Sequence, residues 1–156
     1  MAPLKERLQA DLTAAMKNRD KTRVATLRMA LTGVATEEVS GDAARELTDD
    51  EVLRVINREV RKRKEAAEAF AGAGRAEQAQ AELHEAEVLA EYLPSQLADD
   101  ALETLVAEAI SEVTEQLGAP PGPKQMGQVM RSANARVAGR ADGGRVAAIV
   151  KARLRG

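Results

Sequence analysis

The segment TDDEVLRVINREV, residues 48–60, decides the fold class of this 156-residue chain. Thr48 and, three residues later, Glu51 form a capping-box pattern, in which both side chains satisfy backbone amides at the start of a helix. Apolar residues then recur at helical spacing and not in alternation, at Val52, Val55, Ile56 and Val60. The segment therefore predicts a helix that buries one apolar stripe.

The same helical period recurs along the rest of the chain, and no segment alternates as a strand would. Helices are predicted to begin behind Pro3, at Asp20, at Thr48, near Arg75, at Asp99-Asp100, after Pro123 and at Asp142. Phe70 and Tyr92 are the only aromatic residues, so the core must consist of Ala, Leu, Val and Ile. Alanine and leucine have high helix propensity. The sequence predicts an all-α fold.

Pro94 separates these helices into two groups. We expect residues 1–94 to form a four-helix array and residues 95–156 to form a smaller three-helix domain. In the helix that starts near Arg75, the predicted inner face consists of Ala79, Leu83, Ala86, Leu89 and Leu93. The first helix of the second domain is predicted to be capped by Asp99-Asp100 together with Glu103.

Charge is distributed unevenly along the chain. Residues 124–156 contain eight Lys or Arg and one acid, Asp142, which gives +7, whereas the whole chain carries −2. Residues 65–116 contain thirteen acids and one basic residue, Arg75. A compact basic segment is the electrostatic pattern of a protein that binds a phosphate-bearing partner. The alternative is a basic face that docks on the protein's own acidic band or on a partner protein.

A second basic run, residues 58–64, lies in the helix that starts at Thr48. It could contact an RNA backbone, or it could form a solvated face paired with acids of the following helix. Charge runs usually serve solubility, which favours the second interpretation.

The sequence offers no catalytic arrangement and no site for a cofactor or metal. There is no cysteine, and His84 is the only histidine, so neither a zinc site nor a nucleophile with a histidine base is predicted. No phosphate-binding glycine motif is present. The N-terminus has no apolar signal core and no apolar run could span a membrane, so we expect a cytoplasmic protein.

Two stretches carry a resemblance to a known family: Glu91-Tyr-Leu-Pro-Ser-Gln-Leu97, and Lys124-Gln-Met-Gly-Gln-Val-Met130 followed by Val137-Ala-Gly-Arg-Ala-Asp142. With Met16-Lys-Asn-Arg-Asp-Lys21 and Leu27-Arg-Met29, they resemble the YqeY-like proteins of the GatB/YqeY family. Members of that family share a helical C-terminal domain with the tail of GatB, a subunit of the tRNA-dependent amidotransferase, where the tail is associated with holding tRNA. Nothing in this chain corresponds to the catalytic body of GatB.

The resemblance implies a tRNA-binding or amidotransferase-related accessory protein. Gly127 would allow close packing or close approach of a backbone. The predicted RNA-binding residues are Lys124, Gly127, Gln128, Arg131, Arg136, Arg140, Arg145 and Lys151. The partner is then tRNA, or a protein complex of aminoacyl-tRNA metabolism if the chain is an adaptor that binds no RNA. The family's carbon–nitrogen ligase activity is the third hypothesis, and the missing catalytic residues disfavour it.

Overall fold

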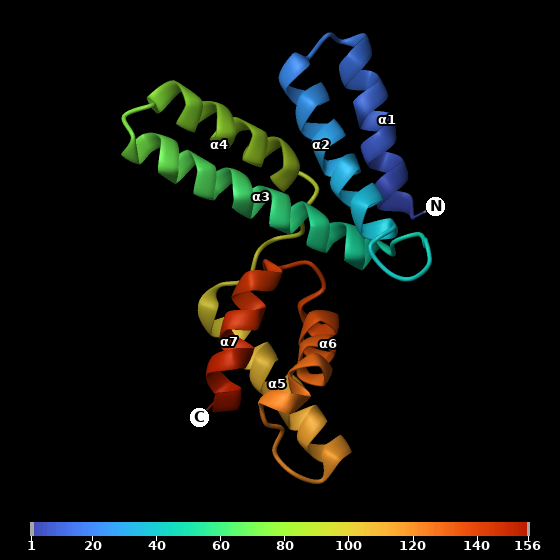
Figure 1. The fold of residues 1–156 in the computed structure, drawn as a ribbon, viewed down its shortest axis with the longest axis vertical. Coiled ribbons are helices and arrows are strands. Elements are labelled where there is room, and N and C mark those ends of the chain that lie inside the picture. The colour runs from blue at the N-terminus through green and yellow to red at the C-terminus, as the bar shows by residue number, and fades with distance from the viewer. Residues whose placement is uncertain (1, 156) are drawn as a thin grey trace. The chain divides into compact units, whose positions relative to one another are not determined.

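The computed structural model describes residues 2–155, and within that range the secondary structure is entirely helical, as predicted (Figure 1). The helices are α1 Pro3–Lys17, α2 Lys21–Glu38, α3 Asp49–Gly72, α4 Ala76–Ala90, α5 Asp99–Leu117, the short 3-10 helix η1 Pro123–Gln125, α6 Met126–Val137 and α7 Gly143–Arg155. The chain divides into two compact units, Met1–Leu93 (unit 1) and Pro94–Gly156 (unit 2). No helix within residues 2–155 is long and apolar enough to cross a membrane.

Helix α3 organises unit 1 because it contacts α1, α2 and α4. Its length lets its N-terminal part pack on the α1–α2 pair while its C-terminal part runs beside α4 (Figure 1). The apolar stripe predicted from the sequence is buried, and so are its partners on the other helices. The core includes Leu8, Leu27, Val34, Val52, Val55, Ile56, Val60 and Leu89.

The predicted helix starts are confirmed at Asp20 and Thr48. The Asp20 carboxylate accepts a hydrogen bond from the backbone N–H of Arg23 at 3.1 Å, and Thr48 and Glu51 form the complete capping box. The predicted cap of α5 was wrong. Ala98 is extended and occupies the cap position without a side-chain cap, so Asp99 and Asp100 fall inside the first turn. There their charge is favourable beside the positive end of the helix dipole.

The predicted inner face of α4 needs one correction. Leu83 is 37% exposed, whereas Val88 is buried at 3%. Ala79, Ala86 and Leu89 are buried as predicted. The helices that α4 contacts are α3 and, to a smaller extent, α2.

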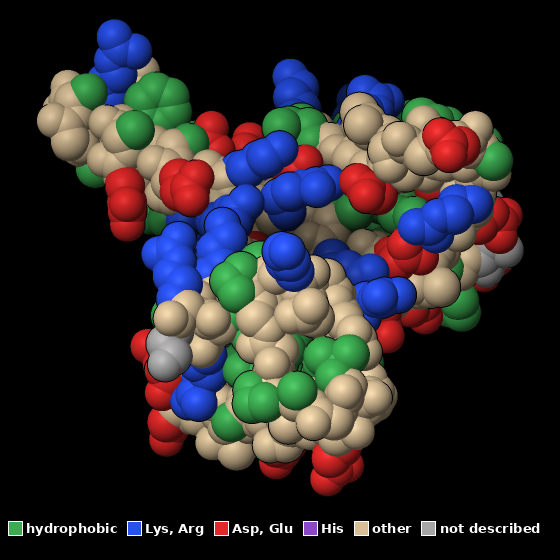
Figure 2. Space-filling view, turned by 60° about the horizontal axis from the view of Figure 1, so that its bottom comes forward, with side chains coloured by type: hydrophobic (Ala, Val, Ile, Leu, Met, Phe, Trp, Pro, Cys, Tyr) green, Lys and Arg blue, Asp and Glu red, His purple; other side chains and the backbone are tan. Residues whose placement is uncertain are grey.

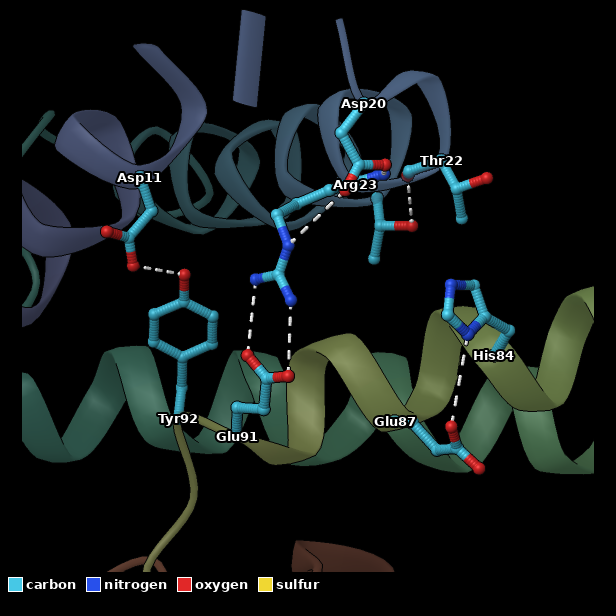
Figure 3. Close-up of polar contacts among 9 residues, drawn as sticks. Asp11, Asp20, Thr22, Arg23, His84, Glu87, Glu91 and Tyr92 are labelled. Carbon is cyan, nitrogen blue, oxygen red and sulfur yellow. Dashed lines mark hydrogen bonds and ion pairs between the residues drawn. The ribbon is translucent and has the colours of Figure 1, made fainter. Parts of the chain in front are cut away.

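Polar contacts anchor the end of α4 to the first two helices (Figure 3). Tyr92, just after α4, donates its hydroxyl to the carboxylate of Asp11 on α1, and the Arg7 guanidinium lies 4.6 Å from the ring centre. Arg23 on α2 binds both carboxylate oxygens of Glu91 at 3.2 Å. Burial and the neighbouring Asp11 carboxylate raise the pKa of Tyr92, so the phenol stays protonated.

Arg63 is a charged residue inside unit 1, with 3% of its surface exposed. Its Nη1 lies 2.9 Å from the Glu59 carboxylate, its Nε lies 3.5 Å from Glu85 on α4, and its Nη2 lies 3.2 Å from the Met29 sulfur on α2. The guanidinium therefore joins three helices at one point.

Unit 2 has its own core, in which α5, α6 and α7 bury small aliphatic side chains. Its fully enclosed residues include Leu102, Val106, Val129, Ala133, Val146 and Val150. Ala138 and Gly139 both have positive φ, at 51° and 80°, and reverse the chain between α6 and α7. The Asp142 carboxylate accepts a hydrogen bond from the backbone N–H of Gly144 at 3.1 Å, at the start of α7 as predicted.

Replacing Arg63 with alanine should lower the free energy of unfolding by about 3 kcal/mol, because it leaves two carboxylates in poorly solvated positions without their cation. Urea denaturation measures the change. Lys62→Ala, on the exposed side of the same helix, is the control and should change stability by about 0.5 kcal/mol or less. A loss below about 1 kcal/mol in Arg63→Ala would show that the guanidinium does not hold the helices together.

Glu51 should make stability depend on pH. The Arg45 guanidinium, followed by the Thr48 backbone, lowers the pKa of Glu51 from 4.5 to about 2. A lowered folded-state pKa stabilises the fold above the unfolded value, and the contribution disappears as pH falls from about 4.5 to about 2. At pH 7 we expect Glu51→Gln to be less stable by about 1 kcal/mol.

Thermal denaturation of the wild type and Glu51→Gln across this pH range measures the difference. The two proteins should converge near pH 2. A difference that stays constant down to that pH would contradict the assigned pairing with Arg45.

Candidate nucleic-acid interface

All of the predicted RNA-binding residues lie in unit 2, on η1, α6, α7 and the turn between the last two helices. They do not form one uniform set. The structure separates side chains that are already bound within the unit from side chains that project into solvent.

One stripe of η1 and α6 faces away from the core. Lys124, Gly127 and Arg131 follow at intervals of three and four residues, which places them on one side of the helix. All three are exposed, whereas Val129 and Ala133 on the opposite side are fully buried. Gln128, on the same stripe, is half-buried and donates its side-chain N–H to Gln116 Oε1 on α5 at 3.0 Å.

Gly127 does not serve close packing inside unit 2. A β-carbon added there would meet no described atom within 4 Å, and the residue is exposed. The expectation of close packing is therefore corrected, while a close approach by an outside backbone stays a prediction. A glycine in this position also weakens the helix slightly, since glycine is a poor helix former.

Arg136 turns toward acids of α5. Its guanidinium lies 3.2 Å from Glu108 and 3.3 Å from Glu112, and Ser132 on the same face of α6 donates its hydroxyl to Glu112. Hydrogen bonds from Ser132 and then Arg136 lower the pKa of the Glu112 carboxyl, which stays ionised. The sequence contained a signal for this contact. Glu108 and Glu112 are four residues apart on α5, and Ser132 and Arg136 are four residues apart on α6, so each pair lies on one face of its helix.

Arg140 and Arg145 bind backbone oxygens of their own unit. Arg140 donates to the carbonyl of Val137 at 2.9 Å and to that of Arg136 at 2.8 Å, so it satisfies carbonyls at the end of α6. Arg145 donates to the Leu97 carbonyl at 3.1 Å and to the Asp99 carboxylate at 2.7 Å. Arg140 thereby stabilises the end of α6, and Arg145 stabilises the segment that leads into α5.

Three of the predicted RNA-binding residues, Lys124, Arg131 and Lys151, are exposed cations, and we call them the exposed basic set. Lys151 lies on α7, one turn before Arg155, and is exposed. Among the residues that the structure describes, none of the three takes part in a hydrogen bond or ion pair. Lys and Arg side chains protrude at many points of the surface in Figure 2. The exposed basic set can meet an anion without first breaking a contact.

The basic run of α3 in unit 1 is more fully occupied. Arg58 lies 3.8 Å from Glu37 on α2, and Arg61 lies 3.8 Å from Glu65 on its own helix. Among the ion pairs described for this run, the pair that involves an acid of α4 is the buried contact between Arg63 and Glu85. The run is paired with acids, but the predicted pairing with the following helix is found only at Arg63, and the other acids lie on α2 and on α3 itself.

The only histidine of the sequence lies in unit 1, whereas the exposed basic set lies in unit 2. His84 lies 3.9 Å from Glu87 on the exposed side of α4 (Figure 3). No cluster of three or more His, Asp or Glu side chains that could hold a metal occurs within residues 2–155. Exposed ammonium and guanidinium groups bind phosphates by charge and hydrogen bonding.

Replacing Arg140 with alanine should lower the stability of the chain by about 2 kcal/mol, because two carbonyls lose a charged donor. Arg140→Lys should restore little of the loss, since an ammonium cannot reproduce the two-pronged guanidinium geometry. Arg131→Ala is the control and should be nearly neutral. Denaturation in urea compares the three variants, and equal stability of Arg131→Ala and Arg140→Ala would contradict the bound role of Arg140.

Comparison with known proteins adds one finding. A family model described as Yqey-like protein matches residues 5–154, which is nearly the whole chain. No curated protein matches the chain.

Proposed function

Because the chain belongs to the YqeY-like protein family over residues 5–154, we propose that it is an accessory protein of tRNA-dependent amidation that binds tRNA through unit 2. The observation that carries the proposal is the exposed basic set, Lys124, Arg131 and Lys151, which has no acid partner among the described residues. Residues 124–156 have a net charge of +7, so they attract a polyanion at a distance and not only in contact.

The predicted RNA-binding residues then divide into two roles. The exposed basic set contacts phosphates, and Gly127 lets the RNA backbone approach the surface of α6. Arg136, Arg140 and Arg145 keep their contacts inside the unit, and their positive charge still adds to the local field. Gln128, bound to Gln116, contributes a polar side chain beside the phosphate contacts.

The recognition fits a folded RNA better than a single strand. Residues 94–156 contain no aromatic side chain on which bases could stack. Phosphate contacts from exposed cations read the shape of a folded backbone and not its sequence. The resemblance of Lys124–Met130 to the tail of GatB supports tRNA as that RNA.

A protein-interaction adaptor is the second candidate, and one feature of unit 2 favours it. A shallow hollow of about 510 Å³ runs along α5 beside Arg136, and it is lined by Thr104, Ala107, Glu108, Ser111, Glu112, Glu115 and Arg136. Its acids would repel RNA and would attract a basic segment of a partner in a complex of aminoacyl-tRNA metabolism.

Changing Lys124, Arg131 and Lys151 together to glutamine should weaken tRNA binding at least tenfold at about 100 mM salt. Each lost phosphate contact should also reduce the slope of log affinity against log salt by about one. Fluorescence anisotropy with labelled tRNA across a salt series measures both quantities.

The matched control changes three exposed cations of α3, Arg54, Lys62 and Lys64, to glutamine and should leave affinity within about twofold. A greater loss from this variant would place the RNA on unit 1. Absence of binding by the wild type at low salt would refute the proposal. Recovery of protein partners after nuclease treatment, lost when Glu108 and Glu115 become lysine, would support the adaptor instead.

A further inference from the structure

Unit 1 carries a second cationic surface that the proposed function does not use. A hollow of about 410 Å³ lies where α1 turns into α2, and its wall consists of Met16, Arg19, Lys21, Val24, Ala25 and Arg28. Three of these residues are basic, none is acidic and three are apolar. Its volume lies within the range of pockets that bind small organic ligands.

The backbone at the rim of the hollow is strained. Arg19 has φ of 55°, in the left-handed region that residues other than glycine and asparagine rarely occupy. Asn18, which would tolerate that conformation better, lies next to it and has φ of −83°. The turn therefore places an arginine, and not the adjacent asparagine, at the strained position. Such strain is common at ligand-binding positions.

The cations of the hollow are not neutralised by the nearby acid. Asp20 is the only acid in residues 12–36. Its carboxylate is turned toward Arg23, accepting from the backbone N–H at 3.1 Å and lying 3.9 Å from the guanidinium, as Figure 3 shows. Arg23 also binds Glu91. Asp20 is thus committed to the start of α2, and the like charges of Arg19, Lys21 and Arg28 repel one another until an anion arrives.

An apolar wall stands beside these cations. Met16 is 50% exposed, so its thioether is open to a ligand in the hollow. The Arg28 Nη2 lies 3.9 Å from the Met16 sulfur, so the thioether and the guanidinium are held together across the two helices. A methionine sulfur packs favourably against aromatic rings. The hollow therefore combines an anion-binding side with a side suited to a flat ring.

From this juxtaposition we infer that the hollow binds one nucleotide, with its phosphate on Arg19, Lys21 and Arg28 and its base against Met16 and Val24. The nucleotide is either free or part of an RNA strand, since both present the same chemistry. The inference does not rest on RNA binding by unit 2, because the hollow is formed entirely by residues of α1, α2 and the turn between them.

NMR titration of the labelled protein with AMP locates the ligand on the chain. We expect shifts of the Met16 methyl group and of the amides of Arg19, Val24 and Arg28, and AMP affinity at least tenfold higher than that of inorganic phosphate or adenosine alone. A short 5′-phosphorylated oligonucleotide is the second arm. Tighter binding of the oligonucleotide than of AMP, with the same resonances shifted, assigns the site to a strand, and the reverse order assigns it to free nucleotides.

Two variants test the named contacts. Arg19→Gly relieves the left-handed backbone and removes a cation, so it should weaken AMP binding at least fivefold while leaving the melting temperature unchanged or higher. Met16→Ala should weaken AMP binding and leave phosphate binding unchanged. Arg75→Gln removes an exposed cation elsewhere in unit 1 and should leave AMP binding within twofold.

The inference fails if neither AMP nor the oligonucleotide shifts Met16 and Arg19, or if AMP binds no tighter than inorganic phosphate. It also fails if Arg19→Gly and Arg75→Gln weaken binding equally. These outcomes are separate from the proposed function, because tRNA binding by unit 2 is measured at Lys124, Arg131 and Lys151.

Discussion

A carboxylate that holds a cation withdraws it from any outside partner, and this constraint determines which surfaces of the protein can bind. In unit 1, Arg63 is paired with Glu59 and Glu85, and Arg23 is paired with Glu91. Arg63 is therefore fully withdrawn from an outside anion, and Arg23 largely so. In unit 2, the same constraint engages Arg136 and Arg145 with acids of α5. The cations that stay available lie on outward faces, among them Lys124, Arg131 and Lys151 of unit 2. A count of basic residues therefore overstates the charge that an anionic partner can contact.

The composition of the two cores explains why ion pairs and hydrogen bonds between helices are needed. The core of unit 1 contains one aromatic residue, Tyr92, which the prediction of a purely aliphatic core missed, and the core of unit 2 contains none. The other core residues are mostly Ala, Val, Leu and Ile, which bury less apolar surface per residue than aromatic side chains do. Polar contacts at the helix ends supplement this packing. Tyr92 with Asp11, and Arg140 with the last carbonyls of α6, lie where neighbouring helices diverge. Some of the cations that could bind an anionic partner therefore stabilise the fold instead.

Local patterns in the sequence were sufficient to predict the helices but not to predict which arginines form ion pairs. The caps at Asp20 and Thr48 were predictable because a helix start is specified within four residues. The cap of α5 was not, because the backbone of Ala98, and not the neighbouring acids, fixes where that helix begins. The contacts of Arg136 and Arg145 join residues 24 to 48 positions apart. Composition alone could not separate these arginines from Lys124, Arg131 and Lys151.

Two residues lower local stability, and one lies on each of the two proposed binding surfaces. Arg19 holds a left-handed backbone that costs of order 1 kcal/mol, although an asparagine stands beside it. Gly127 weakens α6 although a side chain there would meet nothing. A fold selected only for stability would place glycine at the first position and alanine at the second. Each residue instead suits contact with a phosphate backbone, one by presenting a guanidinium and the other by leaving room. The two positions lie in separate units, so each supports its own binding proposal independently of the other.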